Sequence, residues 1–391
     1  MASLIGDDII SRILPCNFHK MVHVIIGEVL HTGNGAFFMK ALVYHGNHDL
    51  RIQNVPYPEM GLSDVILKID YCGICVTDVE AYVYGPKFIF HDYPNPITGD
   101  KTPIITGHEI TGTVEEIGDS VSNITPGQRV VIDGILTCEK CWWCLRGFHN
   151  QCKSMATVGF AINGGLAEYM SWPASKIIPV PDQISSESAA LVEPASVALH
   201  AIRRAHIDRY GQNVAVLGAG TVGILAIQAA KALGARVIAI DNRAMGLELA
   251  SRLGADDVIN STSVDLVKTL LNLTNGIGPD VIVDAAGGKD TPELSIKSVR
   301  SGGRVVLVAI YTNEPQFDFN NIVGRELDVV GSIGYERRDV VEVVKMISTG
   351  DLNPEELVSD VIGLDEILEK GFPRMLATSK DVFRILVSPS K

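Results

Sequence analysis

Short stretches in which hydrophobic and polar residues alternate run from about residue 39 to residue 193, separated by turns rich in Gly, Pro and Asp. Alternation with a period of two is typical of strands that bury one face. We therefore predict an antiparallel or barrel-like β domain in this part of the chain. Its clearest predicted strands are Asp64–Asp70, Gly112–Ile117 and Gln128–Ile132.

The pattern changes between about residues 195 and 332, where continuous apolar runs alternate with segments of helical period. Continuous apolar runs indicate strands buried on both faces, and their alternation with helices indicates a parallel, doubly wound α/β sheet. The predicted strands are Val214–Leu217, Val237–Ile240, Val281–Val283 and Val305–Val308. The predicted helices include Thr221–Leu233 and Ala244–Leu253.

Two later segments, a helix over Val340–Ser348 and a strand over Val382–Val387, are expected to return to the first domain, because the doubly wound sheet is complete without them. The run Met39-Lys40-Ala41-Leu42-Val43 resembles the natural start of a chain, so residues 1–38 are predicted to be an N-terminal extension. The predicted domains are therefore 39–194 together with 333–391, and 195–332.

Composition and charge narrow the class of protein. The chain has 391 residues, of which 46% are hydrophobic and 20% charged, an ordinary globular balance. There are 33 Lys and Arg against 46 Asp and Glu, a net charge of −13 that no basic run offsets, so no nucleic acid and no membrane is an expected partner. No apolar stretch approaches the ~18 residues of a membrane span, and residues 1–38 lack the features of a secretory signal. We therefore expect a cytoplasmic protein.

A glycine-rich turn directly follows the strand predicted around Val214–Leu217. Its sequence is Gly218-Ala219-Gly220-Thr221-Val222-Gly223, and a helix with an apolar face begins within it. This is a dinucleotide-binding fingerprint in its required context: Gly218 permits the tight turn, Gly220 lets backbone amides approach a pyrophosphate, and Gly223 lets helix and strand pack closely. The predicted cofactor-binding residues of the turn are Gly218, Gly220, Thr221, Val222 and Gly223.

Asp241 ends the next predicted strand, at the distance from the turn where a ribose-binding carboxylate is expected. Its negative charge would repel the 2′-phosphate of NADP, so NAD is the predicted cofactor. Arg243 could accept such a phosphate, which keeps NADP as the less favoured alternative.

Four of the seven cysteines lie in one short segment, at Cys138, Cys141, Cys144 and Cys152. Four thiolates in one loop can form a closed tetrahedral sulfur site, the arrangement of structural zinc. A pair of disulfides or four free thiols are the alternatives, but a large chain without a secretory signal favours metal.

A second set of possible metal ligands is dispersed along the chain and consists of Cys75, His108, Glu109 and Glu193. A mixed sulfur, nitrogen and carboxylate set with one open position is what catalytic zinc uses. Buried and inert Cys and His residues are equally consistent with these residues taken alone. If a metal binds, Asp78 is a candidate to orient one of its ligands.

The chain resembles the zinc-dependent medium-chain alcohol/polyol dehydrogenases in the content and order of its motifs. The matching runs are Gly73–Asp78, Gly107–Glu109, the four-Cys segment, Val192–Pro194 and the glycine-rich turn. The resemblance covers residues 39–391 and implies a GroES-like β-barrel catalytic domain beside a Rossmann domain. The segment between Cys75 and His108 looks like the insertion of the 2,3-butanediol dehydrogenase branch. Sorbitol, threonine and sugar dehydrogenases are close relatives.

The resemblance also implies the ligands of a catalytic zinc. Cys75 and His108 would bind it directly. The third protein ligand stays open between two carboxylates. Glu193 holds the position where alcohol dehydrogenases place a Cys, whereas in sorbitol-dehydrogenase-like members Glu109 can bind instead.

Three further roles follow from the resemblance. Thr77 matches the hydroxyl that passes the substrate proton toward the cofactor ribose. Glu80 stands where the family often has a relay His, so it is either a proton acceptor or a solvated helix residue. Arg384 resembles a basic residue that lies near the pyrophosphate, although a surface charge is the alternative.

The predicted reaction is hydride transfer between a secondary alcohol and NAD, with one catalytic and one structural zinc. Vicinal diols or acyloins are the first expected substrates, polyols or sugars the second and threonine the third. A non-catalytic nucleotide-binding relative is the alternative from another class.

The family's dimers and tetramers imply a homodimer or homotetramer. Aromatic residues of the insertion either rim the pocket or pack locally, namely Tyr82, Tyr84, Phe88, Phe90 and Tyr93.

Overall fold

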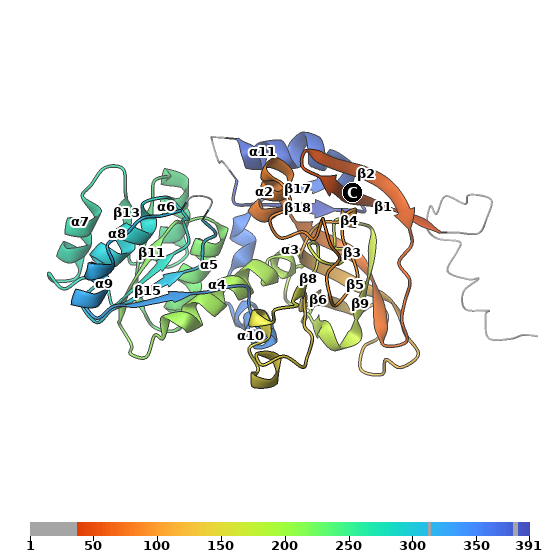
Figure 1. The fold of residues 1–391 in the computed structure, drawn as a ribbon, viewed down its shortest axis with the longest axis horizontal. Coiled ribbons are helices and arrows are strands. Elements are labelled where there is room, and N and C mark those ends of the chain that lie inside the picture. The colour runs from red at the N-terminus through yellow and green to blue at the C-terminus, as the bar shows by residue number, and fades with distance from the viewer. Residues whose placement is uncertain (1–36, 312–313, 378–381) are drawn as a thin grey trace, which may run out of the picture.

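The computed structural model describes residues 37–311, 314–377 and 382–391. They form two lobes joined through a group of helices (Figure 1), and each lobe is built around its own β-sheet. The predicted N-terminal extension, residues 1–38, lies outside the described residues except for Phe37 and Phe38, and Phe38 already belongs to the first strand. None of the described helices is long and apolar enough to cross a membrane.

The first lobe contains a seven-stranded sheet centred on β3 (Asp64–Gly73). Its other strands are β5 (Glu109–Ile117), β6 (Arg129–Ile132), β9 (Tyr169–Pro173), β10 (Ile177–Pro179), β17 (Val358–Gly363) and β18 (Arg384–Ser388). The central strand β3 pairs antiparallel with β5, β9 and β18. Val65, Leu67 and Ile69 of β3 are fully buried, so this strand forms the centre of the core of the lobe.

Two smaller sheets complete this lobe. One consists of β1 (Phe38–Gly46), β2 (Asp49–Pro56) and β4 (Ile104–Ile105), and the other of β7 (Ile135–Leu136) and β8 (Ala156–Thr157). The strands predicted from alternation coincide with β3, β5 and β6, so the predicted barrel-like β domain is confirmed. Apart from the helix Arg337–Thr349 and the helices of the second lobe, the described helices and helical turns are α2 (Val76–Tyr84), η3 (Cys144–Arg146), η4 (His149–Gln151), η5 (Ala174–Lys176), α3 (Ser186–Ala190), η6 (Pro354–Leu357), η7 (Leu364–Glu366), η8 (Ile367–Gly371) and α11 (Phe372–Leu376).

The second lobe holds a six-stranded parallel sheet. Its strands are β11 (Asn213–Leu217), β12 (Arg236–Asp241), β13 (Asp257–Asn260), β14 (Val281–Asp284), β15 (Arg304–Leu307) and β16 (Asp328–Gly331). Their spatial order is β13-β12-β11-β14-β15-β16, the order of a Rossmann dinucleotide-binding domain. The four inner strands match the predicted apolar runs. The edge strands β13 and β16 were not among them, because an edge position leaves residues such as Val258 exposed and needs no continuous apolar run.

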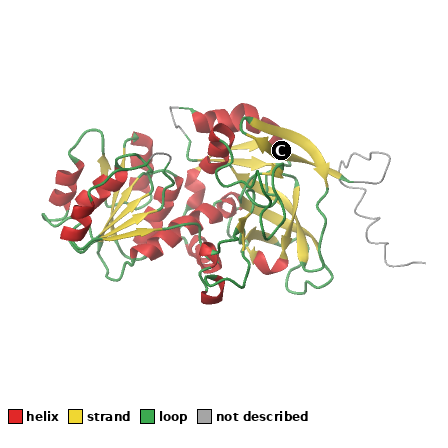
Figure 2. Ribbon diagram, viewed as in Figure 1, coloured by secondary structure: helices red, strands yellow, loops and turns green. Residues whose placement is uncertain are grey.

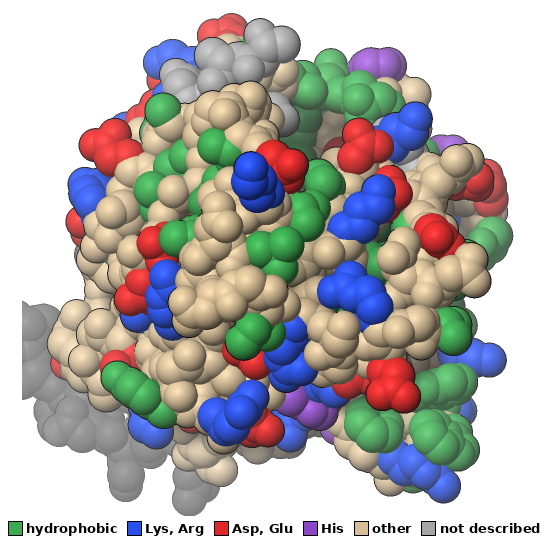
Figure 3. Space-filling model, turned by 90° about the vertical axis from the view of Figure 1, so that its left-hand side faces the viewer, with side chains coloured by type: hydrophobic (Ala, Val, Ile, Leu, Met, Phe, Trp, Pro, Cys, Tyr) green, Lys and Arg blue, Asp and Glu red, His purple; other side chains and the backbone are tan. Residues whose placement is uncertain are grey.

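Helices cover both faces of the parallel sheet (Figure 2). They are α4 (Val192–Ala205), α5 (Thr221–Ala232), α6 (Ala244–Arg252), α7 (Leu266–Leu273), α8 (Thr291–Ser298) and α9 (Phe319–Gly324). The helix α5 is buried along most of its length, and Ile224, Leu225 and Ile227 lie in the core that it shares with α4. On the face that this lobe presents in Figure 3, acidic and basic side chains are intermixed.

The C-terminal segment divides between the two lobes. Strands β17 and β18 join the sheet of β3, as expected for a segment that returns to the first domain. The helix α10 (Arg337–Thr349) packs on α4 instead, where Val340 and Val343 share a core with Leu199 and Ile202. This differs from the predicted return of the whole segment, because the apolar face of α10 has its partner on α4. The exact domain boundaries stay a prediction.

Candidate active site

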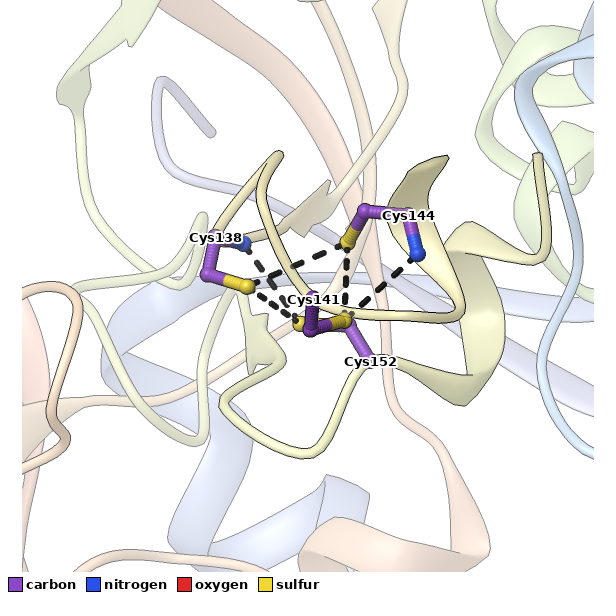
Figure 4. A group of neighbouring side chains, drawn as sticks. All are labelled: Cys138, Cys141, Cys144 and Cys152. Atoms are coloured by element: carbon purple, nitrogen blue, oxygen red, sulfur yellow. Dashed lines mark hydrogen bonds between the residues drawn. The ribbon is translucent and has the colours of Figure 1, made fainter. Parts of the chain in front are cut away.

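The four predicted thiolate ligands meet in one loop of the first lobe. The sulfur atoms of Cys138, Cys141, Cys144 and Cys152 converge (Figure 4). Their separations are 3.4 Å for Cys141–Cys144, 3.6 Å for Cys138–Cys152 and 4.0 Å for Cys138–Cys144. A tetrahedral zinc with bonds of about 2.3 Å holds its sulfurs about 3.8 Å apart. All four cysteines are free rather than disulfide-bonded, so the loop fits the metal and not the disulfide alternative.

Backbone amides point at two of these sulfurs. The N–H of Cys144 donates to Sγ of Cys141 over 3.5 Å, and the N–H of Cys138 donates to Sγ of Cys152 over 3.4 Å. Several hydrogen bonds, the largest from the first of these amides, lower the pKa of Cys141 to about 6, whereas burial, the largest cause, raises the pKa of Cys144 to about 12. A bound divalent cation would hold both groups as thiolates. The donor set is therefore that of structural zinc.

The dispersed candidate residues come together at the ends of three strands. β3 ends at Gly73, and Cys75 follows as the N-cap of α2. β5 runs antiparallel to β3 and begins at Glu109, which pairs with Gly73. β18 is also antiparallel to β3 and begins at Arg384, at the same end of the sheet. The antiparallel pairing thus gathers residues from distant parts of the sequence.

Cys75, His108 and Glu109 form a second group of possible metal ligands, with one ligand atom from each lying within 4.8 Å of the other two. Both carboxylate oxygens of Glu109 are buried and have no hydrogen-bond partner among the described residues. Burying such a carboxylate is costly. Arg384 offsets part of that cost from the side of Oε1, with its Nη2 3.2 Å away, and a metal ion bound with Cys75 and His108 would offset more of it. Glu193 is not part of this group. The geometry therefore favours Glu109 over Glu193 as the third ligand.

Asp78 supports two members of this group. Its Oδ2 accepts the backbone N–H of Cys75 at 3.0 Å, and its Oδ1 lies 3.6 Å from Nδ1 of His108. Burial lowers the pKa of His108, but the charges of Asp78 and Cys75 outweigh burial, so the pKa is raised overall. Zinc-bound His residues commonly direct their second ring nitrogen at a carboxylate. Asp78 is placed for this role.

Glu109 occupies space that the glycine opposite it leaves free. A Cβ on Gly73 would overlap with Oε2 of Glu109. Nη2 of Arg384 lies 3.2 Å from Oε1 of Glu109, and its Nη1 donates to the carbonyl of Ile74 at 2.6 Å. Burial raises the pKa of Glu109, and the positive charge of Arg384 acts against that shift. Arg384 is 4% exposed, so the alternative of a surface charge is excluded.

Three other predicted site residues differ in their burial, namely Thr77, Glu80 and Glu193. Oγ1 of Thr77 is buried and has no hydrogen-bond partner among the described residues. Glu80 is half-buried on the same helix, and its role as a proton acceptor stays a prediction. Glu193 lies in the first turn of α4, where burial raises its pKa to about 7.

Phe160 forms a wall of the site that the sequence pattern did not reveal. Its ring centroid lies 4.7 Å from that of His108 and 6.1 Å from that of Phe88. Phe160 belongs to an irregular segment after β8, where no periodicity marks a residue as functional. Among the aromatic residues of the insertion, Phe88 contacts this wall, whereas Tyr82 packs on Phe372. The predicted aromatic rim is therefore partly local packing.

The glycine-rich turn between β11 and α5 has the backbone that the fingerprint predicts. Gly218 has a φ of +90°, and a Cβ there would lie 2.9 Å from the backbone of Ala286. A Cβ on Gly223 would overlap with the carbonyl oxygen of Gly218, so only glycine lets α5 approach this closely. Beside Gly220 there is open space, since the nearest atom to a Cβ would be 3.8 Å away on Arg243. This opening at the N-terminus of α5 suits a pyrophosphate.

Residues in and beside the glycine-rich turn connect it to both lobes. The hydroxyl of Thr221 donates to the carbonyl of Phe383 at 2.8 Å, which connects the turn to the residue before β18. The side chain of Val222 packs on the apolar core that includes α4. Oδ2 of Asp241 accepts the N–H of Ala219 at 2.6 Å. The turn therefore lies beside the strand that supplies Arg384 to the ligand group.

Alanine at Gly223 and alanine at Gly220 are expected to have different consequences. Gly223→Ala should destabilise the chain by about 2 kcal/mol or more, because the new methyl group displaces backbone. Gly220→Ala should shift the melting temperature by no more than about 2 °C but weaken NADH binding about 10-fold, because its methyl group enters the pyrophosphate space. Thermal unfolding and NADH fluorescence titration measure the two effects. Equal melting temperatures for both variants would contradict the close approach at Gly223.

Comparison with known proteins covers both lobes. Residues 61–182 match the family model described as an alcohol dehydrogenase GroES-like domain, and residues 221–349 match the one described as a zinc-binding dehydrogenase. The (R,R)-butanediol dehydrogenase of Bacillus subtilis is 35% identical over 355 residues, which cover 90% of this chain and 100% of that protein. The sorbitol dehydrogenase of the same species is 29% identical over 356 residues, which cover 90% and 98%.

Solved structures show the same architecture. The crystal structure of 2R,3R-butanediol dehydrogenase from Bacillus subtilis has a TM-score of 0.84 at 34% identity and covers 90% of this chain and 99% of that one. A putative zinc-binding dehydrogenase from Sinorhizobium meliloti, bound to NADP, has a TM-score of 0.81 at 28% identity with the same coverage. The fold, the two ligand groups and these relatives lead to one assignment. The chain belongs to the zinc-dependent medium-chain alcohol dehydrogenases, oxidoreductases that act on CH–OH groups.

Proposed function

We propose that the chain interconverts a vicinal diol and the corresponding acyloin, with NAD as the redox cofactor. The observation that carries this proposal is the group Cys75, His108 and Glu109, at a sheet end that reaches the glycine-rich turn through β18. The name of the butanediol dehydrogenase relative supports a diol, and that of the sorbitol dehydrogenase supports polyols as the second substrate class.

The side chains of the site have separable tasks. Cys75, His108 and Glu109 would hold the catalytic zinc, and the four-Cys loop would hold the structural one. When bound, zinc supplies a Lewis acid for the alcohol oxygen and NAD accepts the hydride. Asp78 would orient the ring of His108, because its Oδ1 lies 3.6 Å from Nδ1 of that ring. Phe160 packs against that ring at a tilt and contributes to its burial.

Oxidation of an alcohol releases the hydroxyl proton as well as a hydride, and Thr77 is proposed to receive that proton. Its buried Oγ1 has no partner among the residues described, so it is free to bond the substrate hydroxyl. From Thr77 the proton passes toward the cofactor ribose, with Glu80 as the nearby carboxylate on the same helix. The ion pair with Arg384 stabilises the negative charge of Glu109 during the reaction.

A substrate panel tests the proposed function. Initial rates of NADH formation would be measured with enantiopure and meso butanediols, sorbitol and threonine, on protein whose zinc content has been determined. We expect two zinc ions per chain and the highest kcat/KM on a butanediol. Highest activity on sorbitol would move the assignment to polyols. A chain that holds both zinc ions and binds NADH but oxidises nothing on the panel would instead be a non-catalytic binding protein.

Assembly and compartment are further parts of the proposal. An exposed edge strand, β16, and the exposed side chains Phe319 and Val323 on α9 support a homodimer or homotetramer. Free cysteines at metal-ligand spacing support the reducing cytoplasm. Light scattering during size-exclusion chromatography measures the oligomeric state, and a monomer would contradict the proposed homo-oligomer.

A further inference from the structure

The segment that carries Phe160 is bonded to the insertion. This wall segment, residues 155–161, and the irregular part of the insertion are far apart in the sequence. Oγ1 of Thr98, in the insertion, donates to the carbonyl of Ala161 at 2.6 Å. The N–H of Phe90, also in the insertion, donates to the carbonyl of Phe160 at 3.3 Å. The insertion therefore fixes the backbone of the wall segment at Phe160 and at the residue after it.

Asn95 fixes the turn from which the Thr98 hydroxyl projects. Asn95 is 1% exposed, and its Oδ1 accepts the N–H of Ile97 at 2.8 Å and that of Thr98 at 3.3 Å. Bonds of this kind between an Asn side chain and the following backbone set the shape of a turn. Nδ2 of Asn95 donates to the carbonyl of Met155 at 3.3 Å, at the start of the wall segment. One side chain thus shapes the turn and attaches it to the wall segment.

The wall segment also lies directly on the backbone that precedes His108. A Cβ on Gly159 would lie 2.6 Å from the carbonyl oxygen of Gly107, and a Cβ on Gly164 would overlap with the same atom. Glycine at these two positions permits the close approach. The wall segment is therefore held between the insertion and Gly107, with the ring centroid of Phe160 4.7 Å from that of His108.

We propose that Thr98 is a positioning residue for substrate selection. Its hydrogen bond to Ala161 keeps Phe160 against His108, and this favours a short diol over a long polyol. The proposal rests on the proposed function, because it takes a diol as the favoured substrate. A substrate oxygen that reaches the ligand group lies beside His108, so the ring of Phe160 limits the carbon chain that follows. A fixed wall excludes longer chains, whereas a wall that can move admits them.

The expected effect follows from the strength of one hydrogen bond between neutral groups, which is about 2- to 10-fold in an equilibrium. Thr98→Val keeps the shape of the side chain and removes the hydroxyl. It should raise the ratio of kcat/KM for sorbitol to kcat/KM for butanediol about fivefold. The change should appear in KM, with kcat within about twofold of wild type, because Thr98 contacts no group of the ligand set. Thr98→Ser keeps the hydroxyl and should restore the wild-type ratio.

Thr102→Val is the matched control for Thr98→Val. Thr102 lies in the same insertion, and its Oγ1 is 2.7 Å from Nδ1 of the exposed His91 rather than bonded to the wall segment. Removal of this hydroxyl should leave the substrate ratio unchanged. All three variants should melt within about 2 °C of wild type, which thermal unfolding checks.

Hydrogen exchange measured by mass spectrometry tests the first step of the proposal without any substrate. The N–H groups of Phe160 and Ala161 both donate to the carbonyl of Thr157. In zinc-loaded protein they should exchange about fivefold faster in Thr98→Val than in wild type, because the wall segment opens more readily. Thr102→Val should show the wild-type rates. Unchanged exchange in Thr98→Val would overturn the proposal, whatever the substrate.

A double-mutant cycle with Phe160→Leu tests the second step. If Thr98 acts through Phe160, then Thr98→Val should change the substrate ratio by less than about twofold once residue 160 is leucine. The same change in both backgrounds, or no change in either, would overturn the proposal. The wild-type rates report the proposed function separately. A chain that prefers sorbitol would contradict the diol assignment, yet a change of ratio that disappears with Phe160→Leu would still support the positioning role of Thr98.

Discussion

Replacement of Cys75 by alanine is expected to lower kcat/KM for butanediol oxidation about 10³-fold and to leave one zinc ion per chain. Sγ of Cys75 is one corner of the ligand group with His108 and Glu109. A Lewis acid at the reacting oxygen is worth several kcal/mol, and each 1.36 kcal/mol corresponds to about a tenfold change in rate. Elemental analysis of the purified variant and steady-state kinetics measure the two effects.

Cys72→Ala is the matched control for Cys75→Ala. Cys72 lies three residues earlier, is fully buried and belongs to neither ligand group. Its loss should cost about 1 kcal/mol of stability through a small cavity while leaving both zinc ions and most of the activity. The assignment of the catalytic site would fail if Cys75→Ala kept two zinc ions and wild-type kinetics, or if Cys72→Ala lost activity as severely.

Serine at Cys144 is expected to empty the four-Cys loop and to lower the melting temperature by about 10 °C. Structural zinc sites use thiolates, and their binding free energy contributes directly to folding. The loss of several kcal/mol shifts the melting temperature by roughly 2–4 °C per kcal/mol in a domain of this size. Differential scanning calorimetry and zinc content measure the effect.

The contacts of the loop explain why its collapse would reach the rest of the molecule. Nδ2 of Asn150, inside the loop, donates to the carbonyl of Ile333 at 2.9 Å and lies 3.2 Å from Nε2 of His200 on α4. Nδ1 of His200 lies 2.8 Å from the buried carboxylate of Asp339 on α10. An unfolded loop would remove Asn150 from this chain of contacts, and α4 also carries Glu193.

Leu145→Ala separates metal loss from simple damage to the loop. Leu145 lies next to Cys144 and is 71% exposed, so its truncation removes no ligand and little packing. The melting temperature should stay within about 2 °C of wild type, as for most surface substitutions. A Cys144→Ser variant that melts no lower than Leu145→Ala would show that the loop does not depend on its metal.

Both lobes could be predicted from local patterns, because strand periodicity and buried apolar runs are set by neighbouring residues. Edge strands such as β13 and β16 were missed, since a strand with an open side needs no continuous apolar run. The packing of α10 on α4 was also missed, because the pattern of Val340 and Val343 shows an apolar face but not its partner.

The candidate site also has parts that the sequence predicts and parts that only the structure reveals. The four cysteines and the glycine-rich turn are contiguous, so their spacing alone indicates zinc and a dinucleotide. The choice between Glu109 and Glu193, and the burial of Arg384 against Glu109, depend on the end at which β3, β5 and β18 meet. No sequence pattern indicates that Phe160 belongs to the site, because its place there comes only from its contact with His108.

The amino-acid sequence by itself determined the two lobes, the four-Cys metal site and the glycine-rich nucleotide turn. Each of these features follows from a local pattern, namely strand and helix periodicity or the spacing of residues within one short segment. Only the tertiary structure places Glu109, and not Glu193, within ligand distance of Cys75 and His108, and pairs Arg243 with Asp241 beside the glycine-rich turn. These choices depend on distances of a few ångströms between elements, and such distances are set by strand pairing and packing.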